Sequence, residues 1–145
     1  MALPFPHVLR FRVRYSETDQ LGTFYNSRAL EWFECGRTEL LRSLGAAYAD
    51  LEKRGVCLPL VEAHVNYLGR ARYDDLLEMK SALSMAGKAS LRFDVAVGQA
   101  HGGGAVASGY TIHAITNAAG KPIRCPAWLA QAFESARPLV SGVAA

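Results

Sequence analysis

Hydrophobic and polar residues alternate strictly near the start of the chain. Apolar side chains stand at every second position from Leu9 to Tyr15, and the positions between them are Arg10, Arg12 and Arg14. A period of two predicts a strand over residues 8–15 with its apolar face, Tyr15 included, turned to the core. The arginine face is expected to meet solvent, with an anion as the alternative.

The period changes after residue 26, where apolar residues recur at the spacing of a helix. This spacing predicts a helix over residues 26–44 whose buried stripe is Ala29, Phe33, Gly36, Leu40 and Leu44. Asn26 or Ser27 can cap its start, and Gly45 can end it. A glycine inside a helix costs about 1 kcal/mol relative to alanine, so we expect Gly36 to allow a close approach to a sheet. A shorter helical segment is predicted around residues 47–53.

Strands dominate the rest of the chain. Alternating segments at residues 61–67, 77–83, 91–97 and 105–116 predict four strands, and Pro126 is expected to begin a short helix reaching about residue 136. Strands that follow one another with short connections are expected to pair antiparallel. The prediction is therefore an α+β fold, a curved antiparallel sheet of about five strands around one long helix. Its 145 residues, 1–145, are expected to form a single domain.

Composition narrows the class of protein. The chain is 50% hydrophobic and 20% charged, and its net charge of +3 suits an anionic ligand without indicating nucleic acid. Cys35, Cys57 and Cys125 are an odd, widely spaced set, which predicts no disulfide framework and a reduced, cytoplasmic protein. Residues 1–7 lack the pattern of a signal peptide, and no apolar run approaches the ~20 residues of a membrane span.

Several kinds of chemistry are not indicated. The four histidines, which are His7, His64, His101 and His113, show none of the short spacings of zinc sites. There is no G-x-S-x-G elbow, P-loop or GxGxxG motif. The sequence therefore predicts no metal and no bound nucleotide cofactor.

The residues between the first strand and the long helix carry the candidate chemistry. They begin at Tyr15 and end at Asn26, with the sequence YSETDQLGTFYN. Asp19 is expected to be ionised, Gly22 permits an unusual turn, and the first N–H groups of the helix, near Asn26, can stabilise an oxyanion. An Asp in such a turn also commonly bonds its own backbone, and on spacing alone that interpretation is the commoner one.

The whole chain resembles the hotdog-fold acyl-CoA thioesterases of the 4-hydroxybenzoyl-CoA thioesterase family. It is most similar to the bacterial subgroup linked with the Tol–Pal system. The segments that carry the resemblance are RYSETDQLG at residues 14–22, WFECGR at 32–37, LPLVEA at 58–63 and ARYDD at 71–75. The first and last of these are fairly specific together, and either alone would be weak.

The resemblance implies an activity and a site. Such an enzyme hydrolyses an acyl-CoA thioester to free acid and coenzyme A, so coenzyme A is part of the substrate and no further cofactor is needed. By position, Asp19 is similar to the catalytic aspartate of the family, as nucleophile or as general base, and the backbone N–H of Asn26 matches the group that polarises the thioester carbonyl. Hotdog thioesterases build this site across a homodimer, often within a homotetramer.

Three positions depart from the subgroup. Asn26 stands where His is frequent, Ala29 where Tyr is frequent, and Arg70 where a Pro usually precedes Ala71. Arg70 and Arg72 are candidates for contact with the phosphates of coenzyme A, although exposed arginines are more often only solvated. The residues expected to bind substrate are Gly22, Phe24, Tyr25, Ala29, Trp32, Phe33, Arg70 and Arg72, and core packing explains the apolar ones on the helix equally well.

Two other functions stay open at the level of sequence. One is hydrolysis of acyl groups from acyl carrier protein, an acidic partner that a slight basic excess would suit. The other is a hotdog dimer that binds acyl-CoA or a protein without turnover.

Overall fold

Three strands with alternating apolar residues form the centre of the sheet. The computed structural model describes residues 7–135, and its strands are β1 (His7–Arg12), β2 (Leu60–Tyr67), β3 (Leu76–Gly87), β4 (Ser90–Gln99) and β5 (Ala105–Ala114). They form one antiparallel sheet in the order β1-β3-β4-β5-β2. The predicted five-stranded antiparallel sheet is therefore confirmed.

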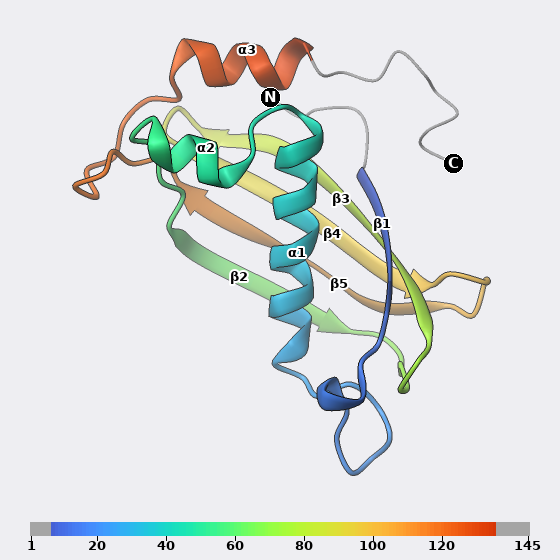
Figure 1. Ribbon diagram of the computed structural model, residues 1–145. Coiled ribbons are helices and arrows are strands. Elements are labelled where there is room, and N and C mark those ends of the chain that lie inside the picture. Colours follow the sequence, from blue (N-terminus) through green and yellow to red (C-terminus); the bar gives the residue numbers. More distant parts are fainter. Residues whose placement is uncertain (1–6, 136–145) are drawn as a thin grey trace.

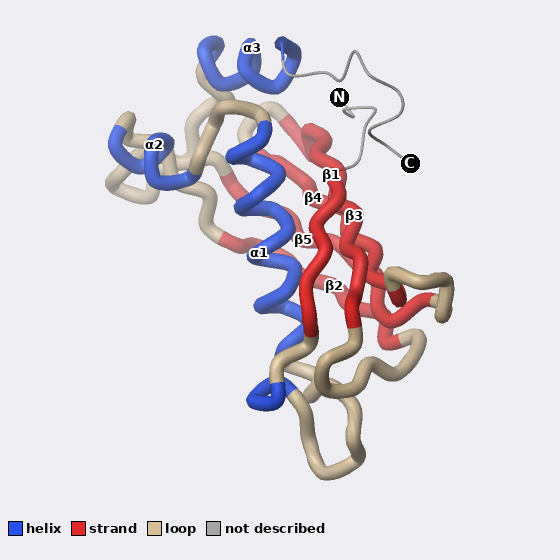
Figure 2. The backbone as a smooth tube through the Cα atoms, turned by 45° about the vertical axis from the view of Figure 1, so that its right-hand side comes forward, coloured by secondary structure: helices blue, strands red, loops and turns tan. Residues whose placement is uncertain are grey.

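The helices lie on one side of this sheet. Helix α1 (Arg28–Ser43) crosses the sheet face, α2 (Tyr48–Lys53) follows it, and α3 (Ala127–Ser135) lies beyond the far end of α1 (Figures 1 and 2). A 3-10 turn, η1 (Tyr15–Glu17), precedes α1. Within residues 7–135 no helix is long and apolar enough to cross a membrane.

The predicted buried stripe of α1 is confirmed, since all five of its residues are buried. A Cβ added to Gly36 would lie 3.0 Å from the sulfur of Met79 on β3, so the glycine does bring the helix close to the sheet. Gly45 ends the helical region with φ +76°. The cap prediction is wrong in one respect, because Ser27 occupies the N-cap position but its side chain makes no capping hydrogen bond.

The first strand is shorter than predicted. Strand β1 ends at Arg12, and Tyr15 belongs to η1 with 77% of its surface exposed, so its predicted place on the buried face is wrong. The reason is local. The N–H of Val13 still bonds the carbonyl of Asp75, but the N–H of Glu17 bonds back to the carbonyl of Arg14 and turns the chain. The Tyr15 ring then packs edge-on against Tyr73 at the surface.

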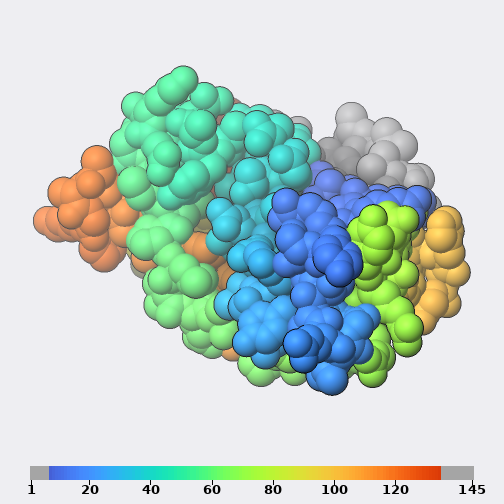
Figure 3. Space-filling view, turned by 60° about the horizontal axis from the view of Figure 1, so that its bottom comes forward, coloured from blue at the N-terminus to red at the C-terminus, as the bar shows by residue number. Residues whose placement is uncertain are grey.

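Strand β2 does not pair with the strand that follows it, contrary to the expectation from chain order. It pairs with β5, where Ala63 lies opposite Thr111, and residues 68–75 carry the chain across the end of the sheet to β3. The N–H groups of Leu68 and Gly69 both bond the carbonyl of Val106, which anchors the start of this connection. The connection therefore passes beside the residues that precede α1. Figure 3 shows this contact, where blue and yellow-green segments of the chain meet.

The core divides into two clusters along α1. One cluster lies near α2 and α3 and includes Leu40, Leu91 and Leu129. The other lies at the N-terminal end of α1, where Val13 and Phe24 pack with Trp32 and with other residues of α1 and the sheet. Residues 17–26 pack against this second cluster through Phe24.

Candidate active site

Residues 17–25 form a small loop closed on itself. The N–H of Tyr25 donates to the carbonyl of Glu17 at 2.8 Å, and the N–H of Asp19 donates to the carbonyl of Thr23 at 2.9 Å. Gly22 turns the chain with φ +76°, a conformation that costs glycine little. The loop is therefore fixed by its own backbone rather than left as an open connection.

The carboxylate of Asp19 is only partly used by this loop. Its Oδ1 accepts a hydrogen bond from the N–H of Leu21 at 2.9 Å, as the turn interpretation predicts. Its Oδ2 has no hydrogen-bond partner among the described residues, and the side chain is half-buried. The two interpretations of Asp19 are thus compatible, because one oxygen holds the turn and the other is free for a ligand.

The start of α1 presents free donors nearby. The N–H of Asn26 and that of Ser27 have no acceptor among the described residues, whereas the N–H of Arg28 donates to the carbonyl of Tyr25. The carbonyl of Asn26 accepts the hydroxyl of Tyr67 at 2.7 Å. Free N–H groups at a helix N-terminus, at the positive end of the helix dipole, stabilise negative charge on a ligand.

An open cavity of about 260 Å³ joins these groups. It is lined by Asp19, Leu21, Thr23, Phe24, Asn26, Tyr67, Gly69 and Arg70. Four of these, Asp19, Phe24, Asn26 and Arg70, are residues that the sequence singled out. Tyr67 was missed because the alternation of β2 marks it only as a strand residue, and nothing local indicates that the end of β2 returns to this loop.

The other predicted substrate-binding residues lie outside the lining of this cavity. Ala29 and Phe33 are fully buried in the core, and Trp32 is 3% exposed against Phe24, with ring centroids 4.7 Å apart. Tyr25 is half exposed, and the backbone N–H of Arg72 bonds the Asp75 carboxylate. A direct role in binding substrate remains a prediction for these residues and for Gly22.

Arg70 reaches the mouth of the cavity from the connection after β2. Its guanidinium donates to the carbonyl of Leu21, and its own carbonyl accepts the side-chain amide of Gln99 at 3.3 Å. The side chain is exposed and forms no ion pair with a carboxylate of the described residues. An exposed guanidinium without a carboxylate partner suits an anionic ligand.

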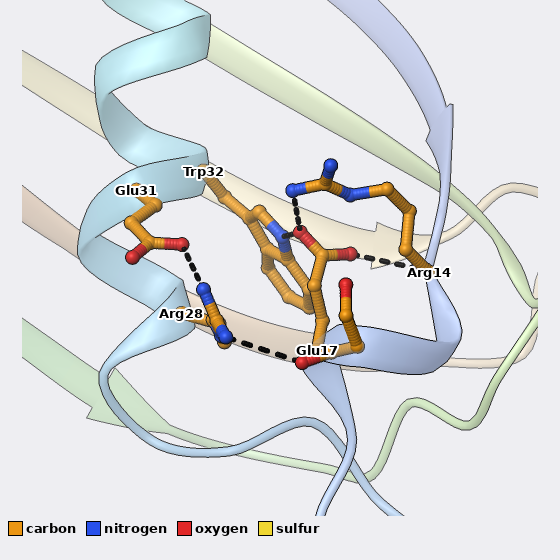
Figure 4. Close-up of polar contacts among 6 residues, drawn as sticks. Arg14, Glu17, Arg28, Glu31 and Trp32 are labelled. Atoms are coloured by element: carbon orange, nitrogen blue, oxygen red, sulfur yellow. Dashed lines mark hydrogen bonds and ion pairs between the residues drawn. The ribbon is translucent and has the colours of Figure 1, made fainter.

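A buried acid lies behind the loop (Figure 4). The side chain of Glu17 is turned toward the core, and the residue is 4% exposed. Its Oε1 accepts the N–H of Arg14 at 2.7 Å, and its Oε2 accepts the indole N–H of Trp32 at 3.0 Å and the Arg14 guanidinium at 3.3 Å. Burial alone would raise the pKa of Glu17, but these donors outweigh burial and hold the pKa below its usual value. Glu17 is therefore an ionised carboxylate inside the protein.

No histidine of the described residues lines this cavity. His113 is buried, and both ring nitrogens are engaged, one with the carbonyl of Leu58 and one with the Thr111 hydroxyl. Burial lowers the pKa of His113, which keeps the ring neutral. Across residues 7–135 no three His, Cys, Asp or Glu side chains lie close enough together to hold a metal ion.

Comparison with known proteins places the chain in a family. The model of the thioesterase-like superfamily matches residues 13–133, a range that includes the loop, α1 and the whole connection after β2. The chain belongs to the thioesterase-like superfamily. The predicted likeness to thioesterases is therefore confirmed.

Individual relatives agree with this membership. The chain is 44% identical over 63 residues to a putative acyl-CoA thioesterase, YneP, of Bacillus subtilis, a match that covers 43% of this chain and 46% of that protein. It is 33% identical over 84 residues to the acyl-CoA thioesterase YbgC of Haemophilus influenzae, which covers 57% of this chain and 62% of that one. The matched regions thus span about half to three fifths of these relatives.

A solved structure supports the fold. The crystal structure of a DHNA-CoA thioesterase from Staphylococcus aureus superposes with a TM-score of 0.81 at 26% sequence identity, over 90% of this chain and 89% of that one. A five-stranded antiparallel sheet crossed by α1 is thus shared with a thioesterase. The hotdog fold implied by the sequence is confirmed at this level.

Proposed function

We propose that the protein is an acyl-CoA thioesterase that hydrolyses a thioester to free acid and coenzyme A. One observation carries the proposal. Asp19, whose Oδ2 is free, and Asn26, whose N–H is free, line one cavity in a chain of the thioesterase-like superfamily. Relatives named as acyl-CoA thioesterases support the choice of substrate class.

The proposed chemistry divides between the two groups. The thioester carbonyl accepts the N–H of Asn26, whose place at the start of α1 favours the negative charge that develops on this oxygen. Asp19 attacks the carbonyl carbon or removes a proton from an attacking water. The C–S bond then breaks. If Asp19 is the nucleophile, this leaves an acyl–Asp19 anhydride, which water hydrolyses to the free acid and the restored carboxylate; if Asp19 is the base, the attacking water gives the free acid directly. In either route the thiolate of coenzyme A takes up the proton that the water loses. The hydroxyl of Tyr67 holds the carbonyl of Asn26 and so fixes the peptide at the start of the helix.

Thiol release from a panel of aliphatic and aromatic acyl-CoAs tests the proposal. We expect release well above the uncatalysed rate for at least one acyl group. The same acyl group on acyl carrier protein should react more slowly, because the cavity is small and Arg70 is placed to bind a phosphate of coenzyme A rather than a protein surface. Faster reaction on the carrier protein would favour that substrate instead. Tight binding of acyl-CoA with no thiol release would reduce the function to binding.

We also propose that Arg70 binds a phosphate of coenzyme A. Arg70→Gln should raise KM for acyl-CoA about tenfold and leave kcat nearly unchanged, since a charge-assisted hydrogen bond to phosphate is lost. With an acyl-pantetheine, which lacks the nucleotide phosphates, the variant should equal the unaltered protein. Arg42→Gln is the matched control, because Arg42 lies exposed near the end of α1 and, within residues 7–135, forms an ion pair with Glu39 alone. An equal rise in KM for both thioesters would contradict the phosphate contact.

The edge of the sheet suggests how copies assemble. Among the described residues, strand β2 has no strand neighbour on its outer side, and Leu60, Val61 and Tyr67 of β2, with Leu68 directly after it, are 52–66% exposed. Leu30 of α1 is 41% exposed as well. An apolar, unpaired edge is a template for another strand. We therefore propose a homodimer in which the β2 strands of two copies lie side by side. Two such dimers could associate further into a homotetramer.

Sedimentation velocity checks this assembly. The unaltered chain should sediment as a dimer or tetramer at micromolar concentration. Val61→Lys should raise the dimer dissociation constant at least tenfold, because it places a charge on the apolar edge. Ala86→Lys, at the exposed C-terminal end of β3, should have no effect. A monomer in the unaltered protein would contradict the proposal.

A further inference from the structure

Glu17 occupies an unusual position for a carboxylate next to a candidate active site. It is almost completely buried and does not border the cavity that Asp19 and Asn26 share. Within the part of the chain that the structure describes, its side-chain hydrogen bonds all go to Arg14 and Trp32. It has no access to substrate, so a role as the catalytic acid or base does not fit its place.

Its contacts link the loop, the residues after β1 and α1, in addition to the packing of Phe11 on Trp32 and the hydrogen bond from Arg28 to the Ser16 carbonyl. Through its side chain, Glu17 is tied to Arg14, two residues after the end of β1, and to Trp32 of α1 (Figure 4). Through its carbonyl it holds the N–H of Tyr25, the residue directly before Asn26. Thr18, with extended backbone, leads from Glu17 straight to Asp19. One residue is thus connected to both ends of the loop and to the helix.

The strength of this connection follows from burial. A buried ionised carboxylate persists only if its oxygens are hydrogen-bonded, and each such bond also satisfies a donor that burial has removed from water. Hydrogen bonds to charged groups are about twice as strong as neutral ones. By contrast, the ion pair of Arg28 with Glu31, one helical turn away in Figure 4, is exposed and screened.

We infer that Glu17 is a positioning residue that sets the carboxylate of Asp19 against the N–H of Asn26. This inference rests on the proposed thioesterase function, which it deepens. Small displacements between reacting groups have large kinetic effects, and an error of about 1 Å can cost as much as 10²-fold. Loss of the Glu17 charge should therefore affect the chemical step more than the binding of coenzyme A, which takes place on the opposite, exposed side of the loop.

The kinetic test is Glu17→Gln. We expect kcat to fall roughly 10- to 100-fold while KM changes less than about twofold, because positioning is lost and the binding groups remain. Glu31→Gln removes the same charge from the exposed neighbour and should leave kcat unchanged. Val56→Ala, in the core cluster at the other end of α1, supplies a variant of comparably lowered stability. Assays are run below the unfolding range of all four proteins.

A second experiment monitors the hydrogen bond between the Trp32 indole and the Glu17 carboxylate directly. The chain has two tryptophans, so Trp128→Phe leaves Trp32 as the sole indole reporter. In that background Glu17→Gln should shift the Trp32 emission, and Glu31→Gln should not. Trp32→Phe keeps an aromatic ring but removes the indole donor, and it should lower kcat as well. In the double variant Glu17→Gln/Trp32→Phe, the factor by which kcat falls relative to the unaltered protein should be smaller than the product of the two single-variant factors. This is expected for residues that act through one contact.

The outcomes separate this inference from the proposed function. If the unaltered protein releases thiol and Glu17→Gln does so within twofold of it, the positioning role is wrong and the function stands. If Val56→Ala loses as much kcat, the effect is general destabilisation and the role is again wrong. If the unaltered protein releases no thiol, the proposed function fails, and amide hydrogen exchange of residues 18–26 decides the inference. Exchange at least tenfold faster in Glu17→Gln than in Glu31→Gln would support it, and equal exchange would overturn it.

Discussion

Asp19→Asn should lower kcat for acyl-CoA hydrolysis at least 10²-fold, the largest catalytic effect that we expect of any single substitution in this chain. The amide cannot act as a nucleophilic carboxylate or as a base. It keeps an oxygen that can accept the N–H of Leu21 as Oδ1 of Asp19 does, so the turn should survive. Thiol release under saturating acyl-CoA measures kcat, and far-ultraviolet circular dichroism checks that the fold is unchanged.

The comparison needs a matched acid elsewhere on the surface. Asp50→Asn serves, because Asp50 lies exposed in the first turn of α2, at the end of the molecule away from the loop. It should hydrolyse acyl-CoA at the rate of the unaltered protein. If Asp19→Asn and Asp50→Asn both retain full activity, Asp19 is not the catalytic carboxylate, whatever the substrate.

Gly109→Ala should be the most damaging structural substitution. Gly109 on β5 lies opposite Val65, and an added Cβ would stand 1.9 Å from the carbonyl oxygen of His64 and 3.1 Å from the ring of Phe33. The first contact is with backbone, which cannot move without separating β2 from β5. We expect a loss of about 3 kcal/mol or more in the free energy of unfolding. Differential scanning calorimetry should show a Tm lower by roughly 6–12 °C.

Gly87→Ala provides the control for this effect. Gly87 also lies in a strand, but an added Cβ there would meet only the Ser90 hydroxyl, at 3.0 Å, at the end of a short flexible side chain. Its change in unfolding free energy should stay within about 1 kcal/mol. Equal stability of the two variants would mean that β2 and β5 can shift apart without cost, against the register described above.

The parts of the fold that the sequence predicts are those encoded by local periodicity. The stripe of Ala29, Phe33 and Gly36 on α1 and the alternation of β3 to β5 follow from side-chain spacing, which depends only on residues a few positions apart. The pairing of β2 with β5 does not, because it depends on how residues 68–75 cross the sheet end. The predicted burial of Tyr15 is wrong for a related reason. The alternation of apolar residues continues to Tyr15, but the hydrogen bond from the Glu17 N–H to the Arg14 carbonyl has already turned the chain out of the strand.

The candidate site divides in the same way. Asp19 and Asn26 stand in one short segment, so sequence and family resemblance suffice to single them out. Tyr67 joins them from β2 through a hydrogen bond to Asn26, and no nearby pattern indicates that contact. Glu17 was visible as an acid in the motif, but its burial against Trp32 depends on how η1 packs on α1. Acidity can be read from a sequence, whereas the side to which an acid turns requires the packed structure.

The separation of Glu17 from Arg70 has a consequence for how this protein can evolve. The groups behind the loop are buried and hydrogen-bonded, so substitutions there are expected to be costly. Leu21 and Arg70, in front of the loop, are exposed, and neither side chain belongs to a core cluster. Exposed positions tolerate replacement with small changes in stability. New acyl or carrier preferences can therefore arise by drift at the rim of the cavity while the buried machinery stays constant.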